Sequence, residues 1–184
     1  MKSRIIILLA LLATLTTMPL CAQRIIYNEH TSGGARILET TQKKVTSLGE
    51  GARKFYMWAG LTSLDIKGIV IYKLKVMYTS EYHLSVEQGA PLVLTLKNGE
   101  KVTLHAGAKG ESKRLDGVET MFASYEIKED ALMEIARTGI TNVAPTVLCF
   151  GNKDYSKDIS LWRLARPLSL RYELLKDYIE KHPE

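Results

Sequence analysis

VIYKLKVMY, residues 70–78, is the stretch of sequence that decides the fold class. Its apolar residues fall at every second position from Val70 to Tyr78, and Lys73 and Lys75 lie between them. A period of two sends alternate side chains to opposite faces of a strand. The stretch therefore predicts a β-strand with one buried face and one solvated face.

A hairpin follows at LVLTLKNGEKVTL, residues 92–104. A two-residue Asn-Gly loop, the usual arrangement for this dipeptide, pairs Leu94 with Thr103 and so sets an apolar side chain against a polar one. A three-residue loop at Lys97–Gly99 pairs Leu94 with Val102 instead. Because directly paired residues share a face of the sheet, the sequence predicts the three-residue loop, with its glycine in the left-handed conformation.

Further segments extend this β-rich region along the chain. Phe55–Leu61 is apolar on both faces, which is typical of a central strand. The polar stretch Glu39–Val45 is typical of an edge strand. We also expect strands at 81–86 and 120–127, and a polar loop at 107–117.

The pattern becomes helical near residue 129. Two acids at its start and Gly139 after its end predict a short helix at 129–138. Residues 140–150 return to a strand, and an apolar stripe at spacings of three and four predicts a principal helix from Pro167 to about Lys181. The predicted fold class is α+β: a curved antiparallel sheet of six to seven strands, with a short helix and a longer C-terminal amphipathic helix.

Residues 1–22 have the layout of a secretory signal peptide. A short basic region precedes the apolar run Ile5–Ala13, which is too short for a membrane-spanning helix. Cleavage after Ala22 predicts a single exported domain at 23–184, with no transmembrane span in the mature chain. The alternative is a lipid anchor at Cys21, which the bulky Leu20 before it disfavours.

The junction Cys21-Ala22-Gln23 resembles that of exported small domains of the Bacteroidetes group. The resemblance covers only these residues. It implies a periplasmic or extracellular location in a bacterium, and it implies no activity.

The charge of the chain is mild and evenly spread. The formal net charge is +5, and the leader holds two basic residues and no acid, so the predicted mature chain carries about +3. Acids and bases alternate, as in Glu111–Asp116, whereas a nucleic-acid-binding protein concentrates its basic residues in one stripe. We therefore expect no nucleic-acid partner.

Cys149 is the one cysteine that remains after the leader is removed. The mature chain therefore forms no internal disulfide, and its hydrophobic core must hold the fold. Cys149 lies in an apolar, strand-like run, and we interpret it as a small buried hydrophobe rather than a nucleophile or a dimer-forming thiol.

Histidines and carboxylates supply the candidate reactive groups. His83 and Glu81 alternate on the outward side of the strand expected at 81–86, and His105 falls on the polar side of its hairpin. If those two strands are neighbours, the three side chains form a catalytic or zinc-binding set. Their spacing matches no metal-ligand motif, and no Gly-x-Ser-x-Gly elbow or phosphate-binding loop is present. The sequence therefore predicts no metal and no cofactor.

Tyrosine is the most frequent aromatic residue, with nine against three phenylalanines. Tyr72, Tyr78 and Tyr82 occupy the apolar positions of their expected strands, and we assign them to the core. Tyr56 and Trp58 share one strand face, and we interpret them as a partner-binding surface.

The expected function is an exported, non-enzymatic binding or accessory module of the bacterial cell envelope, with an envelope protein or a glycan as its partner. The absence of a catalytic motif in the sequence favours this hypothesis. The alternative is a hydrolase of envelope glycan or peptide, with His83, His105 and Glu81 as its candidate catalytic residues in a sheet cleft. A mainly structural subunit of an envelope complex is a third possibility.

Overall fold

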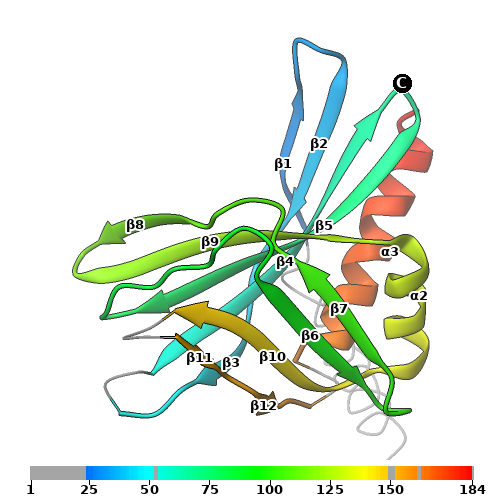
Figure 1. Cartoon of the computed structure of the whole chain (residues 1–184). Coiled ribbons are helices and arrows are strands. Elements are labelled where there is room, and N and C mark those ends of the chain that lie inside the picture. The colour runs from blue at the N-terminus through cyan, green and yellow to red at the C-terminus, as the bar shows by residue number, and fades with distance from the viewer. Residues whose placement is uncertain (1–23, 52–53, 149–151, 161–162, 184) are drawn as a thin grey trace, which may run out of the picture.

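The computed structural model describes residues 24–51, 54–148, 152–160 and 163–183 (Figure 1). Antiparallel strands form strongly curled sheets, and the described residues include two helices, one of them C-terminal. The predicted α+β fold class is confirmed. The leader with its junction, and Cys149, lie outside the described residues. Within the described ranges, no helix has the length and apolarity that a membrane crossing requires.

Seven strands form the larger sheet. They are β1 (Ile25–His30), β2 (Ala35–Thr40), β3 (Lys43–Leu48), β4 (Phe55–Ile66), β5 (Ile69–Ser80), β8 (Glu111–Leu115) and β9 (Val118–Ile127). Their order is β1-β2-β4-β5-β9-β8, and β3 pairs with β4. Because β4 is twelve residues long, β3 and β2 pair with its first and second halves on one edge, and β5 pairs along the other edge.

Five strands form the smaller sheet. They are β6 (Pro91–Leu96), β7 (Lys101–His105), β10 (Ile140–Leu148), β11 (Asn152–Asp154) and β12 (Lys157–Asp158). The β6–β7 hairpin has the predicted register, with Leu94 paired to Val102 and Leu92 to Leu104. Gly99 has a φ of 88°, so the three-residue loop with a left-handed glycine is confirmed.

The helices α2 (Glu129–Thr138) and α3 (Ala165–Lys181) lie side by side (Figure 1). α2 has the predicted bounds. α3 begins two residues before the predicted Pro167, because a proline is tolerated in the first turn, where its missing N–H has no helical partner. α3 packs on β2 and β4, and the buried Arg171 donates through Nε to the carbonyl of Thr41 at 2.9 Å.

The larger sheet has a core face and an outer face. The core face carries alternate residues such as Leu74 and Tyr78, which form one cluster with apolar residues of the smaller sheet and both helices. Tyr72 lies in this core as predicted, whereas Tyr82 is half-buried at its margin. The outer face carries the alternate set, whose half-buried members include Tyr56, Trp58, Lys75, Met77 and Phe122.

The stretch Glu39–Val45, predicted as one edge strand, divides between two strands. β2 lies inside the sheet, between β1 and β4, whereas β3 pairs with β4 alone and is at an edge as predicted. An ion pair of 2.7 Å with Lys75 on the outer face balances the charge of Glu39, the acidic residue of this stretch that lies in the internal strand β2.

Two further segments differ from the prediction. Residues 111–115 form β8 inside the expected loop at 107–117, because the adjacent β9 offers them an edge for pairing. Residues 81–86 form bends rather than a strand, and their one ladder contact is a bridge between Ser85 and Leu148. In neither segment does the sequence indicate which part of the chain the segment contacts.

Candidate functional site

The register of the strands sets the order of the side chains on the outer face. Four rows of paired residues cross β4 and β5: Tyr56–Thr79, Trp58–Met77, Gly60–Lys75 and Thr62–Lys73. β9 extends the first three rows with Thr120, Phe122 and Ser124. At the rise of a β-strand, the six steps from Tyr56 to Thr62 span about 20 Å.

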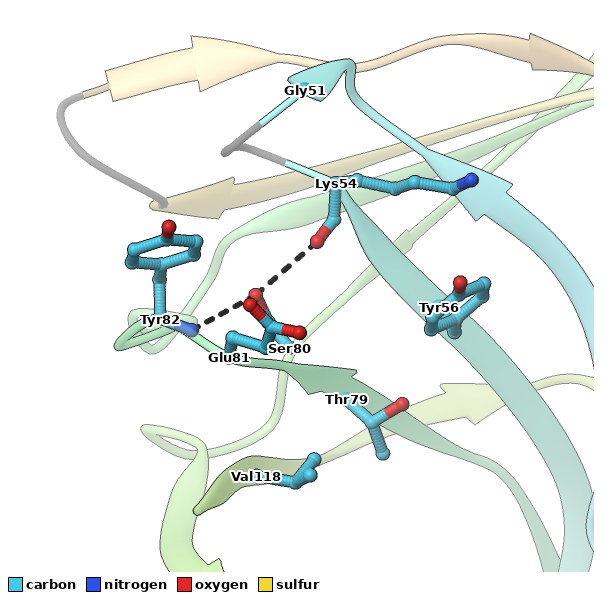
Figure 2. A pocket seen from close by; sticks show the side chains of 8 residues that line it. All are labelled: Gly51, Lys54, Tyr56, Thr79, Ser80, Glu81, Tyr82 and Val118. Carbon is cyan, nitrogen blue, oxygen red and sulfur yellow. Dashed lines mark hydrogen bonds between the residues drawn. The ribbon is translucent and has the colours of Figure 1, made fainter.

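A pocket of about 410 Å³ lies at the Tyr56 end of this face, and we call it the Tyr56 pocket (Figure 2). Its lining includes Lys54, Tyr56, Thr79, Glu81, Tyr82 and Val118. In Figure 2 the rings of Tyr56 and Tyr82 stand on opposite sides of Ser80 and Glu81. The pocket therefore combines two aromatic rings with hydroxyl and charged groups.

The hydroxyl group of Ser80 links the backbone segments that line the Tyr56 pocket. Its hydroxyl donates to the carbonyl of Lys54 at 3.3 Å and accepts from the backbone N–H of Tyr82 at 3.2 Å (Figure 2). These two bonds tie the residue before β4 to the end of β5 and to the bend that follows it. They fix the backbone positions from which Lys54 and Tyr82 line the pocket.

Two lysines approach the ring of Tyr56. The Nζ atoms of Lys44 and Lys54 lie 3.7 Å and 5.7 Å from the ring centroid. Both distances are within the range of a cation–π contact. The pocket and its rim thus present two ammonium groups and, from Glu81, one exposed carboxylate.

Trp58 lies in the next row of the outer face, paired with Lys44 of β3 and with Met77 of β5. Its side chain is half-buried, and its Nε1 is enclosed with no hydrogen-bond partner among the described residues. The structure therefore places Tyr56 in a pocket and Trp58 beside it on one face. That they bind a partner stays a prediction.

A second hollow, of about 350 Å³, begins at Phe122 in the Trp58 row and reaches Thr62, two rows further along, and we call it the Phe122 pocket. Its lining includes Glu39, Thr62, Lys75, Phe122 and Ser124. Lys75 forms the 2.7 Å ion pair with Glu39 across this hollow, and its Nζ lies 6.0 Å from the centroid of the Phe122 ring. The outer face thus has one pocket beside Tyr56 and a second beside Phe122, and Trp58 and Met77 share the row of Phe122.

The three candidate catalytic residues have different surroundings. Glu81 lines the Tyr56 pocket. His83 lies on the surface, with Nδ1 at 3.0 Å from Oε1 of Glu119, and His105 on β7 has Nδ1 at 3.1 Å from the carbonyl oxygen of Gly89. Across the described residues, no group of three or more His, Cys, Asp or Glu side chains is placed to hold a metal ion. A catalytic role for Glu81, His83 or His105 stays a prediction.

Glu119 is the centre of a small polar cluster. Its Oε1 accepts from the hydroxyl of Ser112 and contacts His83, and these interactions, Ser112 first, hold the pKa of Glu119 below its ordinary value. In a hydrolytic triad the histidine lies between the serine and the carboxylate. Here the carboxylate lies between the other two, so the cluster joins β8, β9 and the bend at His83 without activating Ser112.

Sequence reasoning missed Thr79, Ser80, Tyr82 and Val118 of the Tyr56 pocket. Thr79 continues the period of two that already places Lys73 and Lys75 on the outer face, so extending that period finds it. The other three come together only because the end of β5 and the start of β9 meet in the folded sheet. Comparisons with protein-family models, with curated proteins and with solved structures give no match for this chain.

Proposed function

We propose that the protein is an exported, non-enzymatic binding module of the bacterial cell envelope and that its Tyr56 pocket holds a carbohydrate. The lining of the pocket carries this proposal, because it combines two tyrosine rings with hydroxyl, ammonium and carboxylate groups. The volume of about 410 Å³ falls within the range of about 300–1,000 Å³ that is typical of small-molecule sites.

The groups in the pocket match the chemistry of a sugar. The C–H faces of a sugar ring pack on aromatic rings, and Tyr56 and Tyr82 each combine an apolar face with a polar tip. Sugar hydroxyls both donate and accept hydrogen bonds. The ammonium of Lys54 donates, the carboxylate of Glu81 accepts, and the hydroxyl of Thr79 does both.

The expected export of the chain supports the same ligand class. The basic and apolar leader and the Cys21-Ala22-Gln23 junction point to the periplasm or the cell surface. Glycans are a principal component of that compartment. The even distribution of acids and bases favours no polyanionic partner.

The test is binding to an array of linear oligosaccharides of glucose, N-acetylglucosamine and galactose, from monosaccharide to hexasaccharide. We expect the mature protein to bind at least one of these series. Tyr56→Ala should weaken that binding by about tenfold or more, which corresponds to about 1.4 kcal/mol for the lost aromatic contact. Absence of binding by the wild-type protein to every series at millimolar concentration overturns the proposal.

A matched control is Tyr178→Ala, which removes a half-buried tyrosine of α3 that lines neither pocket. It should leave oligosaccharide binding unchanged. Thermal unfolding of both variants shows whether they are folded at the temperature of the assay. Equal losses of binding in the two variants contradict the assignment of the site.

One observation bears on the hydrolase alternative: Glu81 lines the pocket and His83 lies two residues further along the chain. Mass spectrometry of the oligosaccharides after prolonged incubation separates the two functions. A binding module returns them intact. Shortened products that disappear in Glu81→Gln establish a hydrolase in place of the proposed binding module.

A further inference from the structure

We infer that the carbohydrate is a chain of several sugars that lies along the outer face and runs from the Tyr56 pocket to the Phe122 pocket. This inference rests on the proposed function of the Tyr56 pocket. It adds the extent, the direction and the polymeric nature of the ligand.

The two pockets belong to consecutive rows of one face. Tyr56 lies in the first row, Trp58 and Met77 lie in the second, and Phe122, which lines the second pocket, lies in that same second row. Thr62, at the far side of the second pocket, is about 20 Å from Tyr56 at the rise of a strand. A single sugar ring is far shorter than this path, so it occupies one pocket and leaves the other empty.

The chemistry along the path suits sugar units in succession. Tyr56 lies in the first row, and the half-buried rings of Trp58 and Phe122 share the second, so two consecutive rows carry aromatic side chains. Beyond them, Thr62 and Ser124 supply hydroxyl groups, and the ion pair of Lys75 with Glu39 supplies both charges. Each section therefore offers an apolar contact or hydrogen-bonding groups from side chains.

The strands beneath this path favour a glycan over an extended peptide as the ligand. A peptide that binds to a sheet takes most of its affinity from main-chain hydrogen bonds at a strand edge. Here the floor strands are internal: β4 pairs with β2, β3 and β5, β5 pairs with β4 and β9, and β9 pairs with β5 and β8. Their backbone groups are used within the sheet, so the outer face offers side chains alone.

The first experiment measures affinity against chain length. Isothermal titration calorimetry is run with the N-acetylglucosamine series, from monosaccharide to hexasaccharide, and with each other series that binds on the array. We expect affinity to rise more than tenfold between the disaccharide and the hexasaccharide. An affinity that is independent of chain length overturns the inference.

The second experiment blocks the far pocket. Ser124 is exposed on β9 and lines the Phe122 pocket, so Ser124→Trp fills that hollow from the surface. We expect this variant to lower the affinity for the hexasaccharide to that of the disaccharide and to leave the disaccharide unaffected. Lys101→Trp, at an exposed strand position of β7 that lines neither pocket, is the matched control and should bind like the wild-type protein.

The outcomes separate the inference from the proposed function. If no oligosaccharide binds, the proposed function fails and the inference fails with it. If disaccharide and hexasaccharide bind equally, or if Ser124→Trp leaves hexasaccharide binding intact, the Tyr56 pocket stands and only the extended path fails. Preferential binding of random-sequence hexapeptides, tested in the same calorimeter, replaces the glycan chain with a peptide and overturns the inference.

Discussion

Ser63 of β4 has a buried hydroxyl group without a hydrogen-bond partner among the described residues, and Ser63→Ala should therefore stabilise the protein. Its side chain faces the core between Leu38 of β2 and Tyr72 of β5, with 0% of the residue exposed. Its hydroxyl oxygen has no hydrogen-bond partner among the described residues. An unsatisfied buried polar group costs about 1–3 kcal/mol.

The substitution removes this cost and loses little packing. A single oxygen atom makes a few van der Waals contacts of about 0.1–0.2 kcal/mol each, so their loss amounts to less than about 1 kcal/mol. We expect the free energy of unfolding to rise by about 1–2 kcal/mol, and Tm to rise by about 2–8 °C for a chain of this size. Urea unfolding followed by tryptophan fluorescence measures the first quantity, and circular dichroism during heating measures the second.

Ser80→Ala is the matched control, because Ser80 is also buried on the core face but its hydroxyl makes two hydrogen bonds, to Lys54 and Tyr82. This variant should lose about 1 kcal/mol or more, since the bonded N–H and carbonyl lose their partner. The two serine-to-alanine changes should thus have opposite signs. Destabilisation of the protein by Ser63→Ala would refute the reasoning about its unsatisfied hydroxyl.

Three further predictions concern the loop and the titrating groups. Gly99→Ala should cost about 1 kcal/mol in urea unfolding, because its φ of 88° is unfavourable for a residue with a Cβ although the space around it is open; an unchanged midpoint contradicts this. Ser112 and His83 lower the pKa of Glu119. The stabilisation by the ionised Glu119 is therefore fully present above the ordinary carboxyl pKa, and it is lost as the pH falls through the lowered pKa of the folded state. When the pH falls from about 7 to about 3, Glu119→Gln should lose less stability than the wild-type protein. Burial raises the pKa of Tyr72 to about 12. The stabilisation by the neutral Tyr72 is therefore present below the ordinary tyrosine pKa, and it is lost as the pH rises towards 12. Tyr72→Phe should lose less stability than the wild-type protein between about pH 10 and pH 12, and identical alkaline unfolding profiles of the two proteins contradict this prediction.

The parts of the fold that the sequence predicted are those in which neighbouring segments decide the structure. The β6–β7 register followed from matching Leu94 with Val102, because a hairpin loop leaves few ways to pair its two strands. The bounds of α2 followed from two acids at its start and a glycine after its end. In both cases the information lies within about a dozen residues of chain.

The parts that sequence reasoning missed depend on partners far away in the chain or on an available edge. β8 has the polar sequence of a loop, and only the presence of β9 makes it a strand. β2 is polar for an internal strand, and its position depends on the length of β4, which offers room for two neighbours on one edge. Local patterns carry neither kind of information.

For the candidate site too, sequence reasoning predicted the features that depend on local patterns and missed those that depend on distant partners. The face shared by Tyr56 and Trp58 follows from strand alternation, and the structure places both residues on the outer face. The assignment of Tyr82 to a strand failed, because the chain bends after Ser80 and brings the tyrosine to the rim of the pocket. His83 contacts the carboxylate of Glu119, which lies 36 residues away in the sequence. No spacing rule predicts this pair.

The position of α3 has a consequence for the timing of folding. This helix supplies Leu168 and Leu175 to the core, and its end reaches back to the first strands, where Asn28 bonds Tyr178 across 150 residues of sequence. Such distant contacts slow folding, because a long stretch of chain must be ordered before they form. While a ribosome still holds residues 165–181, β2 and β4 lack their cover. The core therefore lacks Leu168 and Leu175 until α3 has been synthesised, which makes closure of the core a late step of folding.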